Sequence, residues 1–477
     1  MHIRFGTDGW RAVIAEDFTF ENIRHVAQAV AEFIHEQAED ASPSAIVGFD
    51  TRFLSDRFAI AVAEVLAGND VQVIMSRLAC PTPVASFAVR HFATTAGVMI
   101  TASHNPPRYN GFKLKDATGG SASPTAIRWV EERIAANLAN GVQLRILDQD
   151  QALARGVIRQ QNFFPFYLEH LKRFVDLDVI GKAGLRVAVD AMHGSGRGYL
   201  RSILTMAGCD VMEIRGDMNP GFGGIYPEPI ERNLSALVAA VRDNRCDLGL
   251  ATDGDADRIG AVDAMGHFVD PQRIFALVLR HLVERRGWRG DVVKTVSTTQ
   301  LVNSLAARYG LTVHETPVGF NHVADLMARN SALIGGEESG GISIRGHVPV
   351  GDGILMGLLL AEIVAYHGQP LHQIVQDLLD DVGPFRYARR DVHTRVFDKR
   401  ALVSELVSSA PSQIAGLAVV KVNNLDGVKY LLEDDSWLLI RPSGTEPVLR
   451  IYAEGRSPSA VEALLEEGTR LGAKWMK

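Results

Sequence analysis

Short apolar runs rich in branched residues recur along the chain, and longer stretches with helical periodicity separate them. These runs occupy residues 45–50, 71–75, 185–190, 210–214, 248–251, 291–296, 311–315 and 332–334. Residues 20–39 show the helical pattern, because their apolar side chains recur on one face and Thr19 stands at the N-cap position. Strand–helix–strand units of this kind form sheets covered by helices. We therefore expect an α/β fold with three similar mixed α/β domains, although the sequence shows no residue-by-residue repeat.

The C-terminal part of the chain has a different pattern. Its apolar runs are separated only by short turns and occupy residues 418–422, 430–432, 437–440 and 448–453. Closely spaced strands favour an antiparallel sheet, so we predict an α+β domain that closes with a helix from about Ser459. A helix over residues 163–176 is expected to link the first two domains. The predicted domains are residues 1–155, 156–264, 265–383 and 384–477.

Length, charge and cysteine use limit the class of protein. A chain of 477 residues suffices for about three or four domains. No apolar run reaches the roughly 18 residues that span a bilayer, and the first residues lack the apolar core of a signal peptide. Cys80, Cys209 and Cys246 are far apart, which fits core thiols in a reducing compartment. With a net charge of −7, we expect a cytoplasmic protein without a membrane or nucleic-acid partner.

The first candidate site follows the apolar run Val98–Ile100, which predicts a buried strand. The strand gives way to the polar sequence Thr101–Pro106, so Ser103 is expected on a loop at the strand end. Pro106 and Pro107 restrict the backbone of this loop, and a restricted loop suits a nucleophilic hydroxyl. Taken alone, the same residues are more typical of an ordinary turn.

The second candidate site is the acidic sequence Asp253–Arg258, again at the end of an apolar run. Asp253, Asp255 and Asp257 alternate along the chain, so in an extended backbone their carboxylates point to one side and repel each other without a cation. An EF-hand loop is excluded, because it needs Gly and Glu where Arg258 and Ala264 stand. Three carboxylates leave coordination positions open, which favours a catalytic Mg²⁺ over a solvated acidic turn.

Two further loops are less specific when each is considered alone. Gly335–Gly341 contains Glu337 and Ser339, whose oxygens suit the hydroxyls of a sugar, but strand-end turns have a similar composition. Arg441–Pro447 combines a guanidinium with hydroxyls and a glycine, which suits a phosphate because backbone N–H groups can approach it. A polar hairpin loop is the competing interpretation.

These four loops, in this order and spacing and together with Phe5–Arg11, resemble the α-D-phosphohexomutase superfamily, which includes phosphoglucomutase, phosphomannomutase and phosphoglucosamine mutase. The resemblance extends over the whole chain. It implies four domains arranged around a central cleft, each contributing one loop to the site.

The resemblance also implies a role for each loop. It implies that Ser103 carries the phosphoryl group and, with Asp253, Asp255 and Asp257, lies at the Mg²⁺ site. Residues implied to bind the substrate are Glu337, Ser339, Arg441, Ser443, Gly444 and Thr445. Residues implied to support phosphoryl transfer or acid/base chemistry are Arg11, His104, Lys113 and Arg258.

The reaction implied is an isomerisation in two transfers, since a covalent phosphoserine divides it into two steps. Phosphoserine would give its group to a hexose 1-phosphate, the 1,6-bisphosphate would turn around, and the other phosphate would return to Ser103. The partner is thus a small sugar phosphate, with Mg²⁺ as cofactor and hexose 1,6-bisphosphate as activator. A monomer or a homodimer fits equally.

The sugar is expected to be glucose, because Glu337–Ser339 resembles the glucomutase form of the loop. Two positions depart from related mutases: Gly341 stands where bifunctional phosphomannomutase/phosphoglucomutases carry His, and Asn321 where glucomutases commonly carry Lys. The alternatives are a mutase for mannose or glucosamine phosphates and, from another class, a non-catalytic sugar-phosphate-binding protein. Such a protein would be expected to have lost Ser103 or one of the three aspartates.

Overall fold

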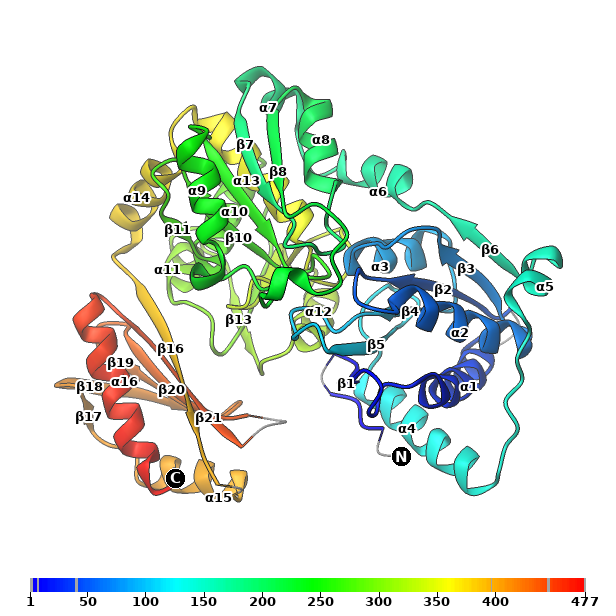
Figure 1. The fold of residues 1–477 in the computed structure, drawn as a ribbon. Helices are drawn as coiled ribbons and strands as arrows, with labels where there is room; N and C mark the ends of the chain where they lie inside the picture. The colour runs from blue at the N-terminus through cyan, green and yellow to red at the C-terminus, as the bar shows by residue number, and fades with distance from the viewer. Residues whose placement is uncertain (1–2, 7, 39–41, 396, 444–446, 476–477) are drawn as a thin grey trace. The chain divides into compact units, whose positions relative to one another are not determined.

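The computed structural model describes residues 3–6, 8–38, 42–395, 397–443 and 447–475. The chain divides into two compact units. Unit 1 comprises Met1–Ile274 and Ser339–His372, and unit 2 comprises Phe275–Glu338 and Gln373–Lys477. Figure 1 shows the elements of each unit along the chain.

Unit 1 begins with a mixed sheet of six strands in the order β1-β5-β4-β2-β3-β6. Its strands are β1 (Trp10–Val13), β2 (Ser44–Phe49), β3 (Gln72–Ser76), β4 (Ala96–Ile100), β5 (Tyr109–Lys115) and β6 (Ile158–Gln161). The sheet is parallel except at β5, which runs antiparallel to both β4 and β1. The loop from β4 to β5 therefore connects two neighbouring strands, and it contains Ser103.

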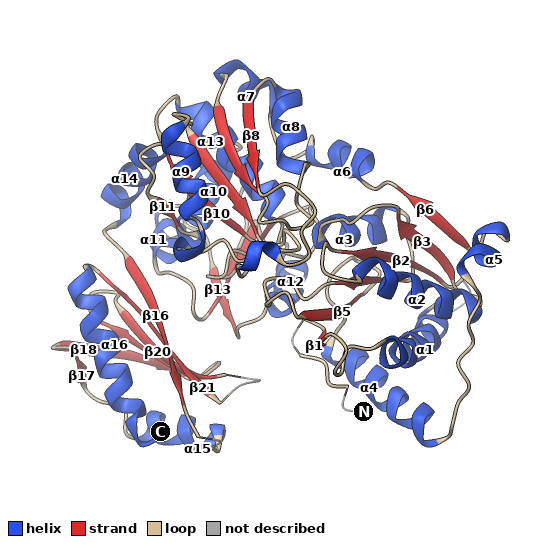
Figure 2. Ribbon diagram, in the orientation of Figure 1, coloured by secondary structure: helices blue, strands red, loops and turns tan. Residues whose placement is uncertain are grey.

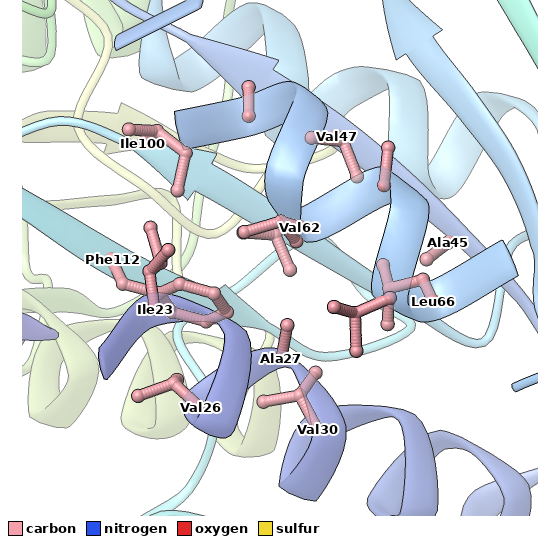
Figure 3. Packing of buried hydrophobic residues seen from close by; sticks show 14 of the residues in the cluster. Ile23, Val26, Ala27, Val30, Ala45, Val47, Val62, Leu66, Ile100 and Phe112 are labelled. Carbon is pink, nitrogen blue, oxygen red and sulfur yellow. The ribbon is translucent and has the colours of Figure 1, made fainter. Parts of the chain in front are cut away.

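Five helices accompany this sheet: α1 (Phe20–Gln37), α2 (Ser55–Gly68), α3 (Thr82–His91), α4 (Pro124–Ala139) and α5 (Gln149–Ala154). The predicted N-cap of α1 is confirmed, since Thr19 Oγ1 accepts a hydrogen bond of 3.2 Å from Asn22 N. The apolar face of α1 packs on α2 and on the sheet. Figure 3 shows this core, with Ile23, Val26, Ala27 and Val30 of α1 near Val62 and Leu66 of α2 and near Ile100 and Phe112 of the sheet.

The second sheet of unit 1 has five strands in the order β11-β10-β9-β7-β8. They are β7 (Arg186–Asp190), β8 (Asp210–Ile214), β9 (Leu248–Thr252), β10 (Ile259–Asp263) and β11 (Phe268–Val269). The helical elements of this region are α6 (Phe164–Leu171), α7 (Leu177–Ala183), α8 (Tyr199–Ala207), η1 (Phe222–Gly224), η2 (Glu231–Asn233), α9 (Ser235–Asp243) and α13 (Gly353–His367). Strand β15 (Ile342–Ile344) also belongs to unit 1. Both α9 and α13 pack against β9 and β10.

The predicted linking helix over residues 163–176 is shorter in the structure. It ends at Leu171, and Asp176 instead caps the next helix, where its Oδ1 accepts from Val179 N at 3.1 Å. An N-cap residue has a non-helical backbone, so a single helix cannot continue through Asp176.

Unit 2 contains a parallel group of three strands, in which β12 (Val292–Thr295) pairs with β13 (Val313–Thr316) and with β14 (Ile334–Gly336). Helices α11 (Leu301–Arg308) and α12 (Phe320–Asn330) lie between these strands in sequence. Helices α10 (Pro271–Glu284) and α14 (Leu371–Val382) each run across a unit boundary in sequence.

The other sheet of unit 2 is antiparallel, as predicted, with the order β16-β21-β20-β19-β18-β17. Its strands are β16 (Arg386–His393), β17 (Gln413–Ile414), β18 (Leu417–Asn423), β19 (Val428–Leu432), β20 (Trp437–Pro442) and β21 (Val448–Gly455). The remaining helices are α15 (Lys399–Ser408), α16 (Pro458–Gly472) and η3 (Ala473–Trp475). Figure 2 shows α16 lying along this sheet, where it contacts β20 and β21.

Two further expectations concern the cysteines and the membrane. Cys80, Cys209 and Cys246 are free and buried, as predicted. Among the helices that the structure describes, none alone is long and apolar enough to cross a membrane, although α13 and α14 would pass that test as a pair bent by 86°.

Candidate active site

Ser103 lies in the loop between β4 and β5, where its side chain is almost completely buried. Its φ is +51°, in the left-handed region that residues other than glycine seldom adopt. The backbone N–H of Ser103 donates to Thr101 Oγ1 at 2.9 Å, and the Thr101 hydroxyl donates to Asp50 Oδ2 at 2.6 Å. A strained backbone conformation of this kind persists only where the surroundings hold it, and such positions cluster at functional sites.

The acidic loop after β9 meets the serine loop directly. Ser103 Oγ donates to Asp253 Oδ2 at 2.9 Å and lies 3.2 Å from His104 Nδ1. Gly254 makes this approach possible, because a Cβ atom at that position would lie only 2.4 Å from the Ser103 carbonyl oxygen. Two segments far apart in the sequence thus form one site within unit 1.

Asp253, Asp255 and Asp257 form a cluster in which one ligand oxygen from each carboxylate lies within 4.8 Å of the others. Asp255 Oδ2 accepts from Thr82 Oγ1 at 2.5 Å and from Lys113 Nζ at 2.9 Å. Asp255 Oδ1 is buried and has no hydrogen-bond partner among the described residues. A buried carboxylate oxygen to which no described residue donates a hydrogen bond suits a hard cation as its partner. The three aspartates therefore fit a Mg²⁺ ion.

The protonation of these carboxylates reflects their crowding. Burial and the neighbouring Asp257 and Asp255 raise the pKa of Asp253 well above its usual value. Burial also acts to raise the pKa of Asp255, but the charge of Lys113 and the hydrogen bond from Thr82 outweigh it, and this pKa is lowered. A bound divalent cation would relieve the repulsion that disfavours charge on Asp253.

Lys113, on β5, is the main positive charge within the cluster. Its Nζ lies 2.7 Å from Asp8 Oδ2, 2.9 Å from Asp255 Oδ2 and 3.1 Å from Asp257 Oδ2. Burial acts to lower the pKa of Lys113, but these three carboxylates outweigh it and raise the pKa well above its usual value. Lys113 therefore remains a cation at neutral pH.

Arg11, Arg258 and His104 border the same site. Arg11 Nη1 donates to Asn105 Oδ1 of the serine loop at 2.7 Å, and Arg258 N donates to Asp253 Oδ1 at 3.1 Å. Burial, followed by the charges of Arg258 and Arg11, lowers the pKa of His104 well below its usual value, so its imidazole is neutral. The structure thus brings all eight predicted catalytic and metal-binding residues together in unit 1.

The predicted sugar loop is divided between the two units. Glu337 Oε1 accepts from Gly319 N at 3.0 Å. Glu338 Oε2 accepts from Ser297 Oγ at 2.6 Å and from Thr295 Oγ1 at 3.3 Å, so this carboxylate is engaged within unit 2. Ser339 is the first residue of the second segment of unit 1.

Arg441, at the end of β20, is held by an acidic neighbour. Its Nε donates to Asp426 Oδ2 at 2.7 Å, and the same oxygen accepts from Val318 N at 3.0 Å. Ser443 is buried, and its backbone N–H donates to Val448 O at 2.8 Å. The other two residues of the predicted phosphate loop, Gly444 and Thr445, lie outside the described residues.

Several residues of this site were missed by the sequence analysis. Asp8 and Thr82 contact the cluster through Lys113 and Asp255, and Arg52 contacts the serine loop. The one available signal was position, since Arg52, like Ser103 and Asp253, lies two or three residues after an apolar run.

Four family descriptions match the chain in order. Those named "Phosphoglucomutase/phosphomannomutase, alpha/beta/alpha domain" I, II and III match residues 2–140, 165–266 and 270–382. "Phosphoglucomutase/phosphomannomutase, C-terminal domain" matches residues 400–470.

Relatives are similar to the chain over nearly its whole length. It is 31% identical to a phosphoglucomutase/phosphomannomutase of Thermococcus kodakarensis, over 98% of both chains. It is also 31% identical to a phosphoglucosamine mutase of Carboxydothermus hydrogenoformans, over 97% of both chains. Among solved structures, a putative phosphomannomutase from Thermus thermophilus superposes with a TM-score of 0.86 at 36% identity, over 99% of both chains.

Proposed function

We propose that this chain, which belongs to the phosphoglucomutase/phosphomannomutase family, acts on mannose or glucosamine phosphates in preference to glucose phosphates. Members of this family are isomerases that transfer a phosphoryl group within a hexose phosphate. The resemblance to the phosphohexomutases is thereby confirmed. The choice of sugar and the residue roles below are proposals.

The hydrogen bond from Ser103 Oγ to Asp253 Oδ2, at 2.9 Å, is the observation that carries the proposed mechanism. It supports Ser103 as the residue that is phosphorylated beside the acidic cluster. In the first transfer, the bond from phosphorus to Ser103 Oγ breaks while a hydroxyl of the hexose monophosphate attacks phosphorus, giving the 1,6-bisphosphate. In the second, Ser103 Oγ attacks the other phosphate and the isomeric monophosphate leaves.

Charged residues of unit 1 are assigned to the transferring group. Lys113, Arg11 and Arg258 would balance the negative charge that spreads over its oxygens. His104, whose Nδ1 lies 3.2 Å from Ser103 Oγ, would accept a proton there in the tautomer that leaves Nδ1 unprotonated. Asp253, Asp255 and Asp257 would hold Mg²⁺, which when bound supplies further charge neutralisation at the phosphoryl oxygens.

The remaining residues are assigned to the part of the substrate that does not react. Glu337 and Ser339 would bind sugar hydroxyls, and Arg441 with Ser443, Gly444 and Thr445 would bind the distal phosphate. Since the sugar must bind in two opposite orientations, these contacts have to accept either end of the bisphosphate.

The preference for mannose or glucosamine rests on two observations that weaken the expectation of glucose. Relatives of similar identity carry phosphoglucosamine mutase or phosphomannomutase names. In addition, Glu338, the middle residue of the Glu337–Ser339 sequence that resembles glucomutases, uses Oε2 to accept from Ser297 and Thr295. A carboxylate oxygen occupied in this way is poorly available to select a sugar.

A coupled assay over three substrates tests this proposal. With hexose 1,6-bisphosphate as activator, we expect kcat/KM for mannose 1-phosphate or glucosamine 1-phosphate to exceed that for glucose 1-phosphate. Glu338→Gln should keep the parental ranking, because its oxygen can still accept from Ser297. A parent enzyme that prefers glucose 1-phosphate over both other sugars would contradict the proposal.

Arg441→Ala is expected to impair isomerisation while leaving the chemistry at Ser103 intact. A charge-assisted hydrogen bond is typically worth about 1.5–3 kcal/mol, so kcat/KM should fall by about 10- to 100-fold. The measurement is to load Ser103 with phosphate from hexose bisphosphate and to follow both isomerisation and the slow hydrolysis of phosphoserine. Hydrolysis should be unchanged.

Arg470→Ala is a suitable control for this variant, because Arg470 lies on α16 and pairs with Glu467 at the surface. It should isomerise like the parent. If Arg441→Ala also isomerises like the parent, then Arg441 does not bind the distal phosphate.

A further inference from the structure

Arg52 is a buried arginine next to the serine loop and has no role in the mechanism so far. It follows β2 in the sequence Asp50-Thr51-Arg52, and only 2% of its surface is exposed. A charged side chain is costly to bury unless its donors find acceptors. The partners of Arg52 therefore indicate what it does.

The guanidinium of Arg52 donates to three backbone carbonyls of the loop that carries Ser103 and to one at the start of β5. Its Nη2 donates to Ser103 O at 2.5 Å and to Asn105 O at 2.6 Å. Its Nη1 donates to Pro106 O at 2.9 Å and to Tyr109 O at 3.0 Å. A planar fork with several fixed donors can hold four carbonyls at once, which a lysine ammonium cannot do in the same geometry.

Asp50 holds the backbone N–H of Ser103 indirectly, through the hydroxyl of Thr101. Asp50 Oδ2 lies 3.1 Å from Arg52 Nε and accepts from Thr101 Oγ1, which in turn accepts from the N–H of Ser103. The N–H and the C=O of Ser103 are therefore both held by the pair Asp50 and Arg52. The ring of Phe222 lies 4.9 Å from the guanidinium and packs against it by a cation–π contact.

From these contacts we infer that Arg52 is a positioning residue, which fixes the backbone of the serine loop so that Ser103 Oγ is oriented for phosphoryl transfer. This inference rests on the proposed phosphoserine mechanism. Ser103 has a φ of +51°, a conformation that needs support from its surroundings, and Arg52 supplies it through the carbonyls. In-line transfer depends on position, and a displacement of about 1 Å can cost about 100-fold in rate.

Substitution of Arg52 tests the inference. Arg52→Met keeps much of the apolar stem and removes every donor, and Arg52→Lys keeps the charge without the fork. We expect kcat to fall by about 100-fold in Arg52→Met and by less in Arg52→Lys, with KM for the hexose 1-phosphate little changed. Rapid-quench transfer of phosphate from hexose bisphosphate to Ser103 should slow by the same factor.

Arg456→Met is the matched control for a general loss of stability. Arg456 donates to Asp434 O at 2.9 Å and packs over the ring of Phe385 at 4.1 Å, so it combines the same two kinds of contact away from the serine loop. Its kcat should stay close to that of the parent. If kcat in Arg52→Met falls no further than in Arg456→Met, the inference is wrong.

Chemical rescue separates positioning from simple structural damage. Arg52→Ala should regain activity when guanidinium is added at about 50 mM, far below the molar range in which it unfolds proteins. Arg456→Ala should gain nothing. No gain in Arg52→Ala, measured on protein that is folded by circular dichroism, would overturn the inference. If Arg52→Met does not fold, a parental kcat in Arg52→Lys would overturn it equally.

The same experiment distinguishes this inference from the proposed function. Mass spectrometry of the parent after treatment with hexose bisphosphate should find phosphate on Ser103. A parent that never carries it would contradict the proposed function itself. A parent that carries it, together with an Arg52→Met variant that transfers phosphate at the parental rate, would contradict only the role of Arg52.

Discussion

Replacing Ser103 with alanine is expected to lower kcat by at least about 10⁴-fold, the order of loss seen when a catalytic nucleophile is removed. Ser103 Oγ is the atom that would carry the phosphoryl group, and alanine has no acceptor for it. The fold should survive, because the change removes only the contacts of one hydroxyl, to Asp253 and His104, and each such hydrogen bond contributes about 1 kcal/mol. Isomerisation is measured in a coupled assay, and phosphate incorporation from hexose bisphosphate by mass spectrometry.

Ser86→Ala provides the matched control. Ser86 is a fully buried serine of α3 in the same unit, and its Oγ has no partner among the described residues. Removing this oxygen should leave both kcat and phosphate incorporation at parental values. If Ser103→Ala keeps parental turnover and still becomes phosphorylated, another residue carries the phosphate and the proposed mechanism fails.

Much of the fold could be predicted because its strands are apolar and its helices amphipathic. The eight apolar runs first expected in the α/β part each overlap an observed strand, from β8 at its observed bounds, Asp210–Ile214, to the run 332–334, which shares only Ile334 with β14. Local signals were sufficient there, as they were for the Thr19 cap of α1. Strand β16 was missed, because Arg386–His393 contains mostly charged and polar residues and few apolar ones. A sequence without an apolar run is typical of a loop, so it gave no signal for a strand.

The candidate site was predictable to a lesser degree. The three aspartates were favoured as a metal site by their local sequence, whereas Ser103 was singled out only when the four loops were considered together. The partners of these residues depend on contacts between distant segments, and a single sequence does not reveal them. Arg52 lies 51 residues from Ser103 in the chain and still donates to its carbonyl. Similarly, no local pattern indicates that Glu338 is engaged by Ser297, 41 residues away.

The acidic cluster leads to the second large effect, which is expected for Asp255→Asn. This substitution keeps the shape of the side chain but removes one negative charge, and an amide nitrogen cannot accept from both Thr82 and Lys113 as Asp255 Oδ2 does. The variant should bind Mg²⁺ more weakly, because a site of three carboxylates has little redundancy. A catalytic metal contributes several kcal/mol to the barrier, so kcat should fall by about 100- to 1,000-fold.

Isothermal titration with Mg²⁺ gives a readout of this variant that does not depend on turnover. Asp263→Asn is the control, because Asp263 is a buried aspartate at the end of the neighbouring β10 whose Oδ1 accepts from Met265 N and His267 N. Asparagine can accept the same backbone bonds, so this control should keep parental Mg²⁺ affinity and kcat.

Removal of the metal should affect the parent and the Asp255→Asn variant differently. A chelator should reduce the parent to low activity and change the variant little, since the variant has already lost most of its metal. The alternative is that the Lys113 ammonium itself is the cation of the cluster, because its Nζ lies 2.9 Å and 3.1 Å from two of the three carboxylates. In that case the parent would turn over normally in chelator, and Lys113→Met would inactivate it. That outcome would show that the acidic loop binds a lysine rather than a metal, while leaving Ser103 as the proposed phosphate carrier.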